Sequence, residues 1–147
     1  MTKAILDLAF PSLTDDQRSR LGVLAEERLF ASGDVIIQQK KGHDFLAVVL
    51  EGNTRVLQES YENINVEFTG PLGPGDVFGE ISFFDHNPSS ATLVADGELR
   101  VLCFGRDDVL KMIDRDHEFG MQFYRSILLT LCRRIRNTNV RVQPNLT

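Results

Sequence analysis

Cysteine is scarce in this chain, and long apolar runs are missing. The 147 residues include two cysteines, Cys103 and Cys132, which are too few for a disulfide scaffold or a four-cysteine metal site. No apolar stretch reaches the length of about 18 residues that a membrane-spanning helix needs. The N-terminal stretch has Lys3 as its only cation and contains Asp7, unlike a secretory signal. We therefore expect a soluble protein in the reducing cytoplasm.

Patterns that carry catalytic or metal chemistry are also missing. His43, His86 and His117 do not stand at metal-ligand spacing from one another or from either cysteine. The acidic residues are scattered, and no nucleophile, base and acid come together in a motif. We therefore expect no metal site and no enzymatic activity.

The chain contains enough apolar residues for a core, and its charge is unevenly distributed. Hydrophobic residues make up 42% of the sequence and charged residues 25%, which is typical of a globular domain. The net charge of −5 conceals that residues 121–147 carry five arginines and no acid. A basic end of this kind can indicate nucleic-acid binding, but it is more often the solvated face of one amphipathic helix.

Apolar periodicity divides the chain into three parts. A helix is predicted over about 13–29, where a Thr-Asp-Asp-Gln capping box precedes apolar residues at helical spacing. Short β-rich runs separated by Gly, Pro and Asp turns follow over about 30–105, a pattern typical of a sandwich or roll. Helices are predicted again over about 106–140. We therefore expect a mainly β fold with flanking helices, forming a single domain over 1–147.

The last predicted helix carries two apolar stripes. Phe119, Phe123 and Ile127 are four residues apart and form one face, which we expect to pack against the β domain. The second stripe alternates steps of three and four, as in a coiled-coil seam. This seam consists of Met121, Tyr124, Leu128, Leu131, Ile135, Thr138 and Val142. We expect the seam to join two copies in a homodimer, and the alternative is that it packs within its own domain.

One segment has the pattern of an anion site. Over residues 78–95 a strand ends at Gly79, a short helical turn starts near Glu80, and an Asn-Pro turn leads through small hydroxyl residues to a new strand. Free N–H groups at the start of a helix favour negative charge. The hydroxyl groups of Ser82 and of the serines after the proline are further candidate donors.

In the order of these motifs the chain resembles the cyclic nucleotide-binding domain family. This β-roll module occurs in bacterial catabolite-activator-type regulators, cyclic-nucleotide-dependent kinases and gated channels. Residues 30–36 resemble the first strand of the roll, residues 45–52 its strand ending in glycine, and residues 72–80 and 88–95 the two sides of its phosphate-binding cassette. Residues 132–136 resemble the basic part of the C-terminal helix. The resemblance implies a jelly-roll-like β-roll (a double-stranded β-helix) with an N-terminal helix and a long C-terminal helix.

The resemblance also implies a ligand, cAMP or cGMP, and roles for individual residues. The cassette glutamate, here Glu80, accepts a hydrogen bond from the ribose 2′-hydroxyl, and backbone N–H groups after it hold the cyclic phosphate. The cassette side of the expected site comprises Gly79, Glu80, Ile81, Ser82, Ser89, Ser90 and Ala91. On the C-terminal helix, Thr138 and Asn139 match the positions that read the purine edge.

Two positions depart from the family's pattern. The family places an arginine directly after the cassette proline, where it pairs with the phosphate, and this chain has Ser89 there. Because a hydroxyl replaces a permanent charge, we expect affinity for cyclic nucleotides to fall by roughly ten- to more than a hundred-fold. Lys40 stands in an early turn where the family usually has glycine, and Lys40 or Lys41 is a candidate for a substitute cation.

Two functions are compatible with these residues. In the first, the chain is a stand-alone regulatory sensor that binds a cyclic nucleotide and passes the signal to an unidentified output protein by moving its C-terminal helix. In the second, the roll has lost its ligand, as Ser89 suggests, and acts as a dimerisation or protein-interaction module. A different ligand class such as haem is a minor third possibility. DNA binding is not expected, because only residues 141–147 follow the helix, where the bacterial regulators continue into a helix-turn-helix domain.

Overall fold

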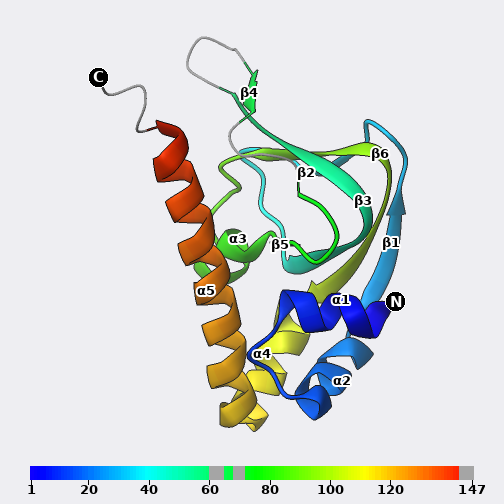
Figure 1. The fold of residues 1–147 in the computed structure, drawn as a ribbon, viewed down its shortest axis with the longest axis vertical. Coiled ribbons are helices and arrows are strands. Elements are labelled where there is room, and N and C mark those ends of the chain that lie inside the picture. Colours follow the sequence, from blue (N-terminus) through cyan, green and yellow to red (C-terminus); the bar gives the residue numbers. More distant parts are fainter. Residues whose placement is uncertain (60–64, 68–71, 143–147) are drawn as a thin grey trace.

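The computed structural model describes residues 1–59, 65–67 and 72–142. In the described residues, two helices are followed by a set of strands containing one short helix, and then by two further helices (Figure 1). The helices are α1 (Thr2–Ala9), α2 (Asp15–Val23), α3 (Glu80–Asp85), α4 (Arg106–Arg115) and α5 (His117–Val142). The strands are β1 (Glu26–Phe30), β2 (Val35–Ile37), β3 (Phe45–Glu59), β4 (Asn65–Glu67), β5 (Val77–Phe78) and β6 (Thr92–Gly105). The predicted mainly β fold with flanking helices is confirmed.

Two long antiparallel strands form the frame of the roll. β3 and β6 pair along most of their length and curve together around its interior (Figure 1). β1 and β2 pair with β6, while β4 and β5 pair with β3. The register of β3 against β6 shifts around Glu51, next to Gly52, which has a φ of +97°. A Cβ atom at Gly52 would lie 2.3 Å from the carbonyl oxygen of Glu98, so glycine allows this bend.

Alternating side chains of β3 enter two separate apolar clusters. Leu46 and Val48 belong to the first cluster, which lies between the sheet and helices α1, α2, α4 and α5. Ala47 and Val49 belong to the second, which is formed by the strands and fills the roll. Successive side chains of a strand point to opposite faces, so one strand supplies both clusters.

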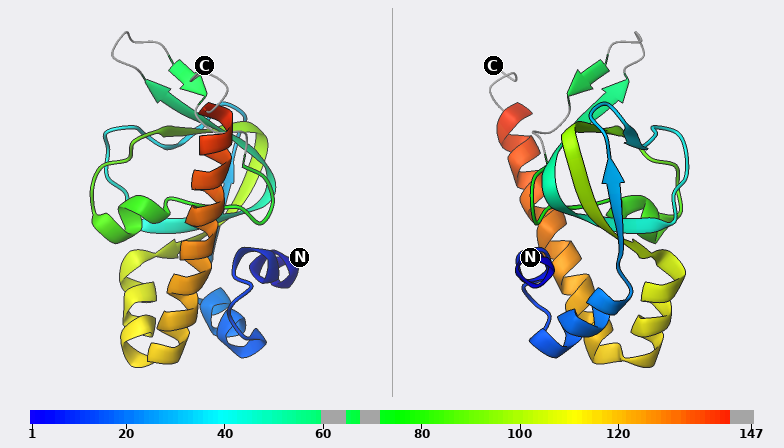
Figure 2. Two further views of the ribbon diagram at one scale, coloured as in Figure 1. Left: turned by 60° about the vertical axis from the view of Figure 1, so that its left-hand side comes forward. Right: turned by 90° about the vertical axis from the view of Figure 1, so that its right-hand side faces the viewer.

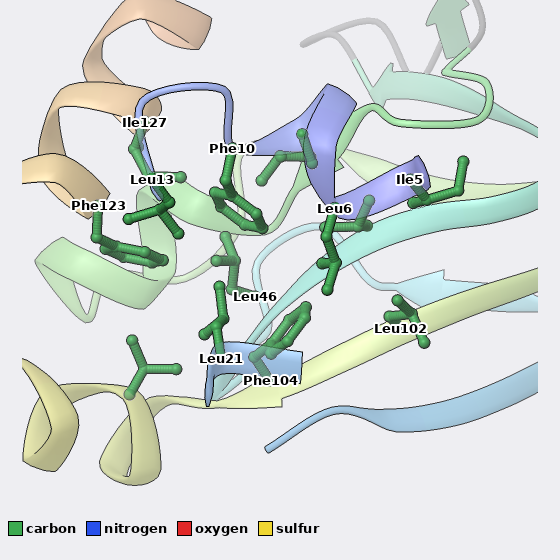
Figure 3. Packing of buried hydrophobic residues seen from close by; sticks show 14 of the residues in the cluster. Ile5, Leu6, Phe10, Leu13, Leu21, Leu46, Leu102, Phe104, Phe123 and Ile127 are labelled. Carbon is green, nitrogen blue, oxygen red and sulfur yellow. The ribbon is translucent and has the colours of Figure 1, made fainter. Parts of the chain in front are cut away.

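Phe10 occupies the centre of the first cluster, just after α1 (Figure 3). Its ring stacks on Phe123 of α5 with the centroids 5.6 Å apart, and it meets Phe104 of β6 edge-on at 6.3 Å. All three rings are fully buried. Aromatic pairs in these geometries add to the stabilisation that comes from burying their apolar surface. They attach the N-terminal segment and α5 to the same face of the sheet.

Helix α5 runs beside both the N-terminal helices and the roll (Figure 2). Its predicted buried face is confirmed, because Phe119 and Phe123 are fully buried and Ile127 is 3% exposed. The described seam residues are mostly uncovered: Met121, Tyr124, Leu128 and Ile135 are between 44% and 62% exposed. Within the described residues, no helix has the length and apolar character needed to span a membrane.

The N-terminal region differs from the prediction in two respects. The helix predicted over about 13–29 ends at Val23, and Glu26–Phe30 form β1, which pairs with β6. Leu24 packs against the first cluster, but from Glu26 onward the backbone finds its hydrogen-bond partners on β6, so tertiary pairing overrides the helical spacing. Leu29, expected on a buried helical face, is 70% exposed. Helix α1 was not predicted.

Candidate functional site

The segment between β5 and β6 carries most of the expected site. Gly79, which links β5 to α3, has a φ of +79°. A Cβ atom there would lie 3.0 Å from His43 Nε2 and 3.1 Å from the carbonyl oxygen of Phe45, so the position requires glycine. His43 Nε2 donates a hydrogen bond to the carbonyl oxygen of Gly79 at 3.0 Å. These contacts fix the point at which α3 begins.

Arg106, the first residue of α4, holds the same segment from the other side. Its guanidinium donates hydrogen bonds to the carbonyl oxygens of Ser82 at 2.8 Å, Phe83 at 2.9 Å and His43 at 2.8 Å. A short helix leaves many carbonyl groups without helical partners, and one guanidinium has five donors to satisfy them. Arg106 was not predicted as a site residue, because its partners lie on distant parts of the chain.

A cavity of about 620 Å³ opens beside this segment. Its volume falls within the range of small-molecule binding sites, and most of its surface is apolar. The roll interior and α5 contribute Ile37, Val56, Leu93, Leu131, Arg134 and Ile135 to its walls. The cavity therefore lies where the cassette, the roll and the long helix meet.

The residues predicted for the cassette side are brought together here. Those that line the cavity are Gly79, Glu80, Ile81, Ser82, Ser89, Ser90 and Ala91. Glu80 and Ser82 are buried, whereas Ile81 is 57% exposed. Thr138 and Asn139 belong to the last turns of α5, but their side chains lie outside the described residues.

Glu80 is bonded to the long helix. Its carboxylate is 5% exposed and forms an ion pair with Arg134 of α5. The same guanidinium also donates a hydrogen bond to the carbonyl oxygen of Val77. From the sequence, Arg134 was expected only as part of the basic stretch of the helix, and its bond to Glu80 was not predicted. Glu80 retains acceptor capacity beyond this bond, because an ionised carboxylate has about four lone-pair positions.

Ser89 uses its hydroxyl within its own loop. The Oγ atom donates a hydrogen bond to the carbonyl oxygen of Ala91 at 2.7 Å and accepts one from the Ala91 N–H at 3.3 Å. A serine hydroxyl has a single proton to donate. In this arrangement Ser89 stabilises the turn into β6 and offers no proton to a ligand.

Neither cysteine is among the described residues that line the cavity. Cys103 is part of the cluster inside the roll, and burial raises the pKa of its thiol to about 11, so it remains protonated at neutral pH. Cys132 is exposed on α5. In the part of the chain that the structure covers, no three His, Cys, Asp or Glu side chains cluster in a way that would hold a metal ion.

Known proteins share the fold of this chain. The family model of the cyclic nucleotide-binding domain matches residues 27–116. A cyclic nucleotide-binding domain from Methylobacillus flagellatus KT superposes with a TM-score of 0.90 at 19% identity, covering 97% of this chain and 83% of that one. The N-terminal domain of a transcriptional regulator from Streptomyces coelicolor is 28% identical, with a TM-score of 0.76 and coverage of 92% and 94%.

The similarity extends to a longer regulator. The Thermus thermophilus catabolite activator protein is 25% identical with a TM-score of 0.79, and the match covers 92% of this chain and 62% of that protein. The matched family model spans more than half of the present chain, including the roll, α3 and α4. The chain therefore belongs to the cyclic nucleotide-binding domain family.

Proposed function

We propose that this protein is a regulatory module that binds a cyclic nucleotide in the cavity between the cassette, the roll and α5. The observation that carries the proposal is the open cavity of about 620 Å³ with the buried carboxylate of Glu80 in its wall. In the motif resemblance Glu80 matches the family's ribose-binding glutamate, and we propose the same role for it here. A buried acceptor in a mostly apolar site is the type of group that fixes the orientation of a ligand.

In this proposal the phosphate of the ligand lies against the cassette. The N–H groups of Ile81 and Ser82 belong to the first turn of α3 and have no acceptor within the helix. Ser90 and Ala91 form the opposite side of the phosphate position. The base extends toward α5, where Thr138 and Asn139 are the proposed contacts of the purine edge.

Binding is proposed to act through α5. Arg134 already connects this helix to Glu80, and Leu131 and Ile135 of the same helix line the cavity. The carboxylate of Glu80 accepts a hydrogen bond from Arg134 of α5. A ribose hydroxyl that also donates to Glu80 therefore alters the bond that holds α5. A ligand with different affinity for two positions of the helix shifts its equilibrium between them.

We also propose that α5 joins two copies of the chain. The seam residues Met121, Tyr124, Leu128 and Ile135 are exposed at heptad spacing, whereas Leu131 between them packs against the first cluster. Such a seam is a characteristic coiled-coil surface, and a second copy of the same helix is its complementary partner. Sedimentation of the purified protein tests this part, and a strictly monomeric protein at micromolar concentration contradicts it.

The second candidate is a ligand-free interaction module. It is favoured by the hydroxyl of Ser89, which donates its proton to the carbonyl oxygen of Ala91 and not to a ligand. In that case we expect Phe83, Phe84 or the C-terminal helix to fill the cavity. Phe83 is buried in the first cluster, and Phe84 packs on Phe123 and Tyr124 of α5. Both rings pack elsewhere. Helix α5 forms one wall through Leu131, Arg134 and Ile135 and leaves a cavity of about 620 Å³, so the binding function is the better supported.

Isothermal titration calorimetry with cAMP and cGMP tests the proposed function. We expect measurable binding by the wild-type protein and binding roughly ten- to a hundred-fold tighter by Ser89→Arg, which restores the charged partner of the phosphate. Glu80→Gln keeps the shape of the side chain and is expected to weaken binding in both backgrounds. Heat of binding from Ser89→Arg but none from the wild type at millimolar ligand contradicts the proposal.

A further inference from the structure

The walls of the cavity leave the phosphate of a nucleotide without a charged partner. The charged or ionisable described side chains in the walls are Glu80, Asp85, Arg134 and His43. Arg134 is paired with Glu80, and the Nε2 proton of His43 is used on the carbonyl oxygen of Gly79. Glu80 and Asp85 are acids and repel an anionic ligand. A positive charge for the phosphate must therefore come from a residue outside these four.

The turn between β2 and β3 lies directly against Ser89. The N–H of Lys40 donates to the carbonyl oxygen of Ser89 at 2.8 Å, and the N–H of Ser89 donates to the carbonyl oxygen of Lys41 at 3.0 Å. Two backbone hydrogen bonds therefore join the lysine pair to the residue that replaces the family's arginine. Residues bonded in this way lie about 5 Å apart at their Cα atoms. The four-carbon stem of a lysine is long enough to bring its ammonium group to the adjacent site.

Both lysine side chains are available for this role. Lys40 and Lys41 are exposed, and neither ammonium forms an ion pair with a carboxylate of the described residues. Lys40 also has a φ of +71°, a conformation that glycine adopts at no cost and lysine adopts with strain. A strained residue at the edge of a binding site suggests that its side chain has a function.

We infer that Lys40 and Lys41 supply the positive charge that the cassette lacks at Ser89, and that they contact the phosphate of the bound cyclic nucleotide. The inference rests on the proposed function and adds the residues that recognise the anion. A pair of flexible ammonium groups replaces one rigid bidentate guanidinium, so the site keeps its charge but loses fixed geometry. Because the ammonium groups are exposed, binding should weaken with rising salt concentration.

The test is calorimetry with cAMP on the wild type, the double variant Lys40→Gly/Lys41→Ala and the control Lys3→Ala/Lys111→Ala. The control removes the same number of charges from lysines in α1 and α4. We expect the first double variant to bind at least about tenfold more weakly than the wild type and the control to bind equally well. Each protein is then measured again with Ser89→Arg added. In that background the lysine changes should lower the affinity for cAMP by less than about twofold, because the arginine supplies the charge.

A thermal measurement separates loss of charge from loss of fold. Lys40→Gly alone relieves the positive φ, so we expect Tm to rise by about 2–4 °C while affinity falls. Equal affinity of the wild type and Lys40→Gly/Lys41→Ala overturns the inference and leaves the proposed function intact. Binding by Ser89→Arg but not by the wild type at millimolar cAMP overturns the proposed function of the natural chain and the inference with it, since the lysines then fail to replace the arginine. Absence of binding by every protein, including Ser89→Arg, overturns the proposed function itself and the inference with it.

Discussion

Arg134 of α5 donates a hydrogen bond to the buried carboxylate of Glu80, which lies 54 residues earlier in the chain. This contact joins the long helix to the start of α3, the segment that carries the expected phosphate site. A second bond from the same guanidinium reaches the carbonyl oxygen of Val77 in β5. The ion pair therefore forms part of the proposed binding site and also attaches α5 to the roll.

Removing Arg134 should destabilise the fold through Glu80. Arg134→Met leaves a carboxylate that is 5% exposed without its charged partner, and we expect the free energy of unfolding to fall by about 1.5–3 kcal/mol. Urea denaturation measures this change. Arg133→Met is the matched control, because Arg133 is the exposed neighbour on the same helix. The double variant Arg134→Met/Glu80→Gln should recover part of the loss, and strictly additive losses would refute the coupling.

Gly79→Ala should disturb the cassette by contact as well as by backbone strain. Its φ of +79° is unfavourable for alanine, and the new Cβ would meet the carbonyl oxygen of Phe45 at 3.1 Å. We expect a loss of about 2–3 kcal/mol in unfolding free energy. Gly97→Ala is the control, because Gly97 has a φ of +81° but open space around it. Equal losses for the two variants in chemical denaturation would show that the contact with Phe45 has no effect.

Asp116 should make stability depend on pH in the acid range. A hydrogen bond from the Phe119 N–H and a further bond from Arg20 lower the pKa of this carboxyl below its ordinary value. A lowered pKa in the folded state gives stability that is present above the ordinary aspartate pKa and lost as the pH falls through the folded value. Unfolding measured from pH 6 to about 3 should therefore decline less steeply for Asp116→Asn than for the wild type. Asp114→Asn is the control, and a slope for Asp116→Asn as steep as that of the wild type would count against this role.

The seam of α5 should control association without controlling the fold. Leu128 is 60% exposed and belongs to the heptad stripe, whereas its neighbour Leu129 is 52% exposed and lies outside the stripe. Leu128→Glu should raise the dissociation constant of the dimer by at least about tenfold in sedimentation, since it places like charges at the interface. Leu129→Glu should leave association unchanged. Equal behaviour of the two variants would mean that the heptad stripe is not the interface.

Local patterns in the sequence predicted much of this architecture. Thr14 and Gln17 form the expected capping box, and the stripe through Phe119, Phe123 and Ile127 is buried as its spacing indicated. The order of the motifs led to the cyclic nucleotide-binding family, which the family model confirms. These features depend on residues close in the chain or on a pattern that many sequences share.

What the sequence did not reveal depends on distant contacts. Glu26–Phe30 form a strand because β6 offers hydrogen-bond partners, although the apolar spacing there suits a helix. The bond of Arg134 to Glu80 joins residues 54 apart in sequence, so no local pattern indicates it. Lys40 and Lys41 were candidate cations from the sequence, but the backbone hydrogen bonds that join their turn to Ser89 were not predicted. Arg106 was missed for the same reason.

Backbone amide NMR spectra recorded during titration with cAMP test the central claim most directly. If the cyclic nucleotide occupies the cavity, the amide signals of Ile81, Ser82 and Ala91 should shift with ligand concentration, because these groups line the proposed phosphate position. Signals from Arg20 and Lys111, which line a separate hollow between α2 and α4, should stay in place. Unchanged signals from Ile81, Ser82 and Ala91 at millimolar cAMP would contradict the account.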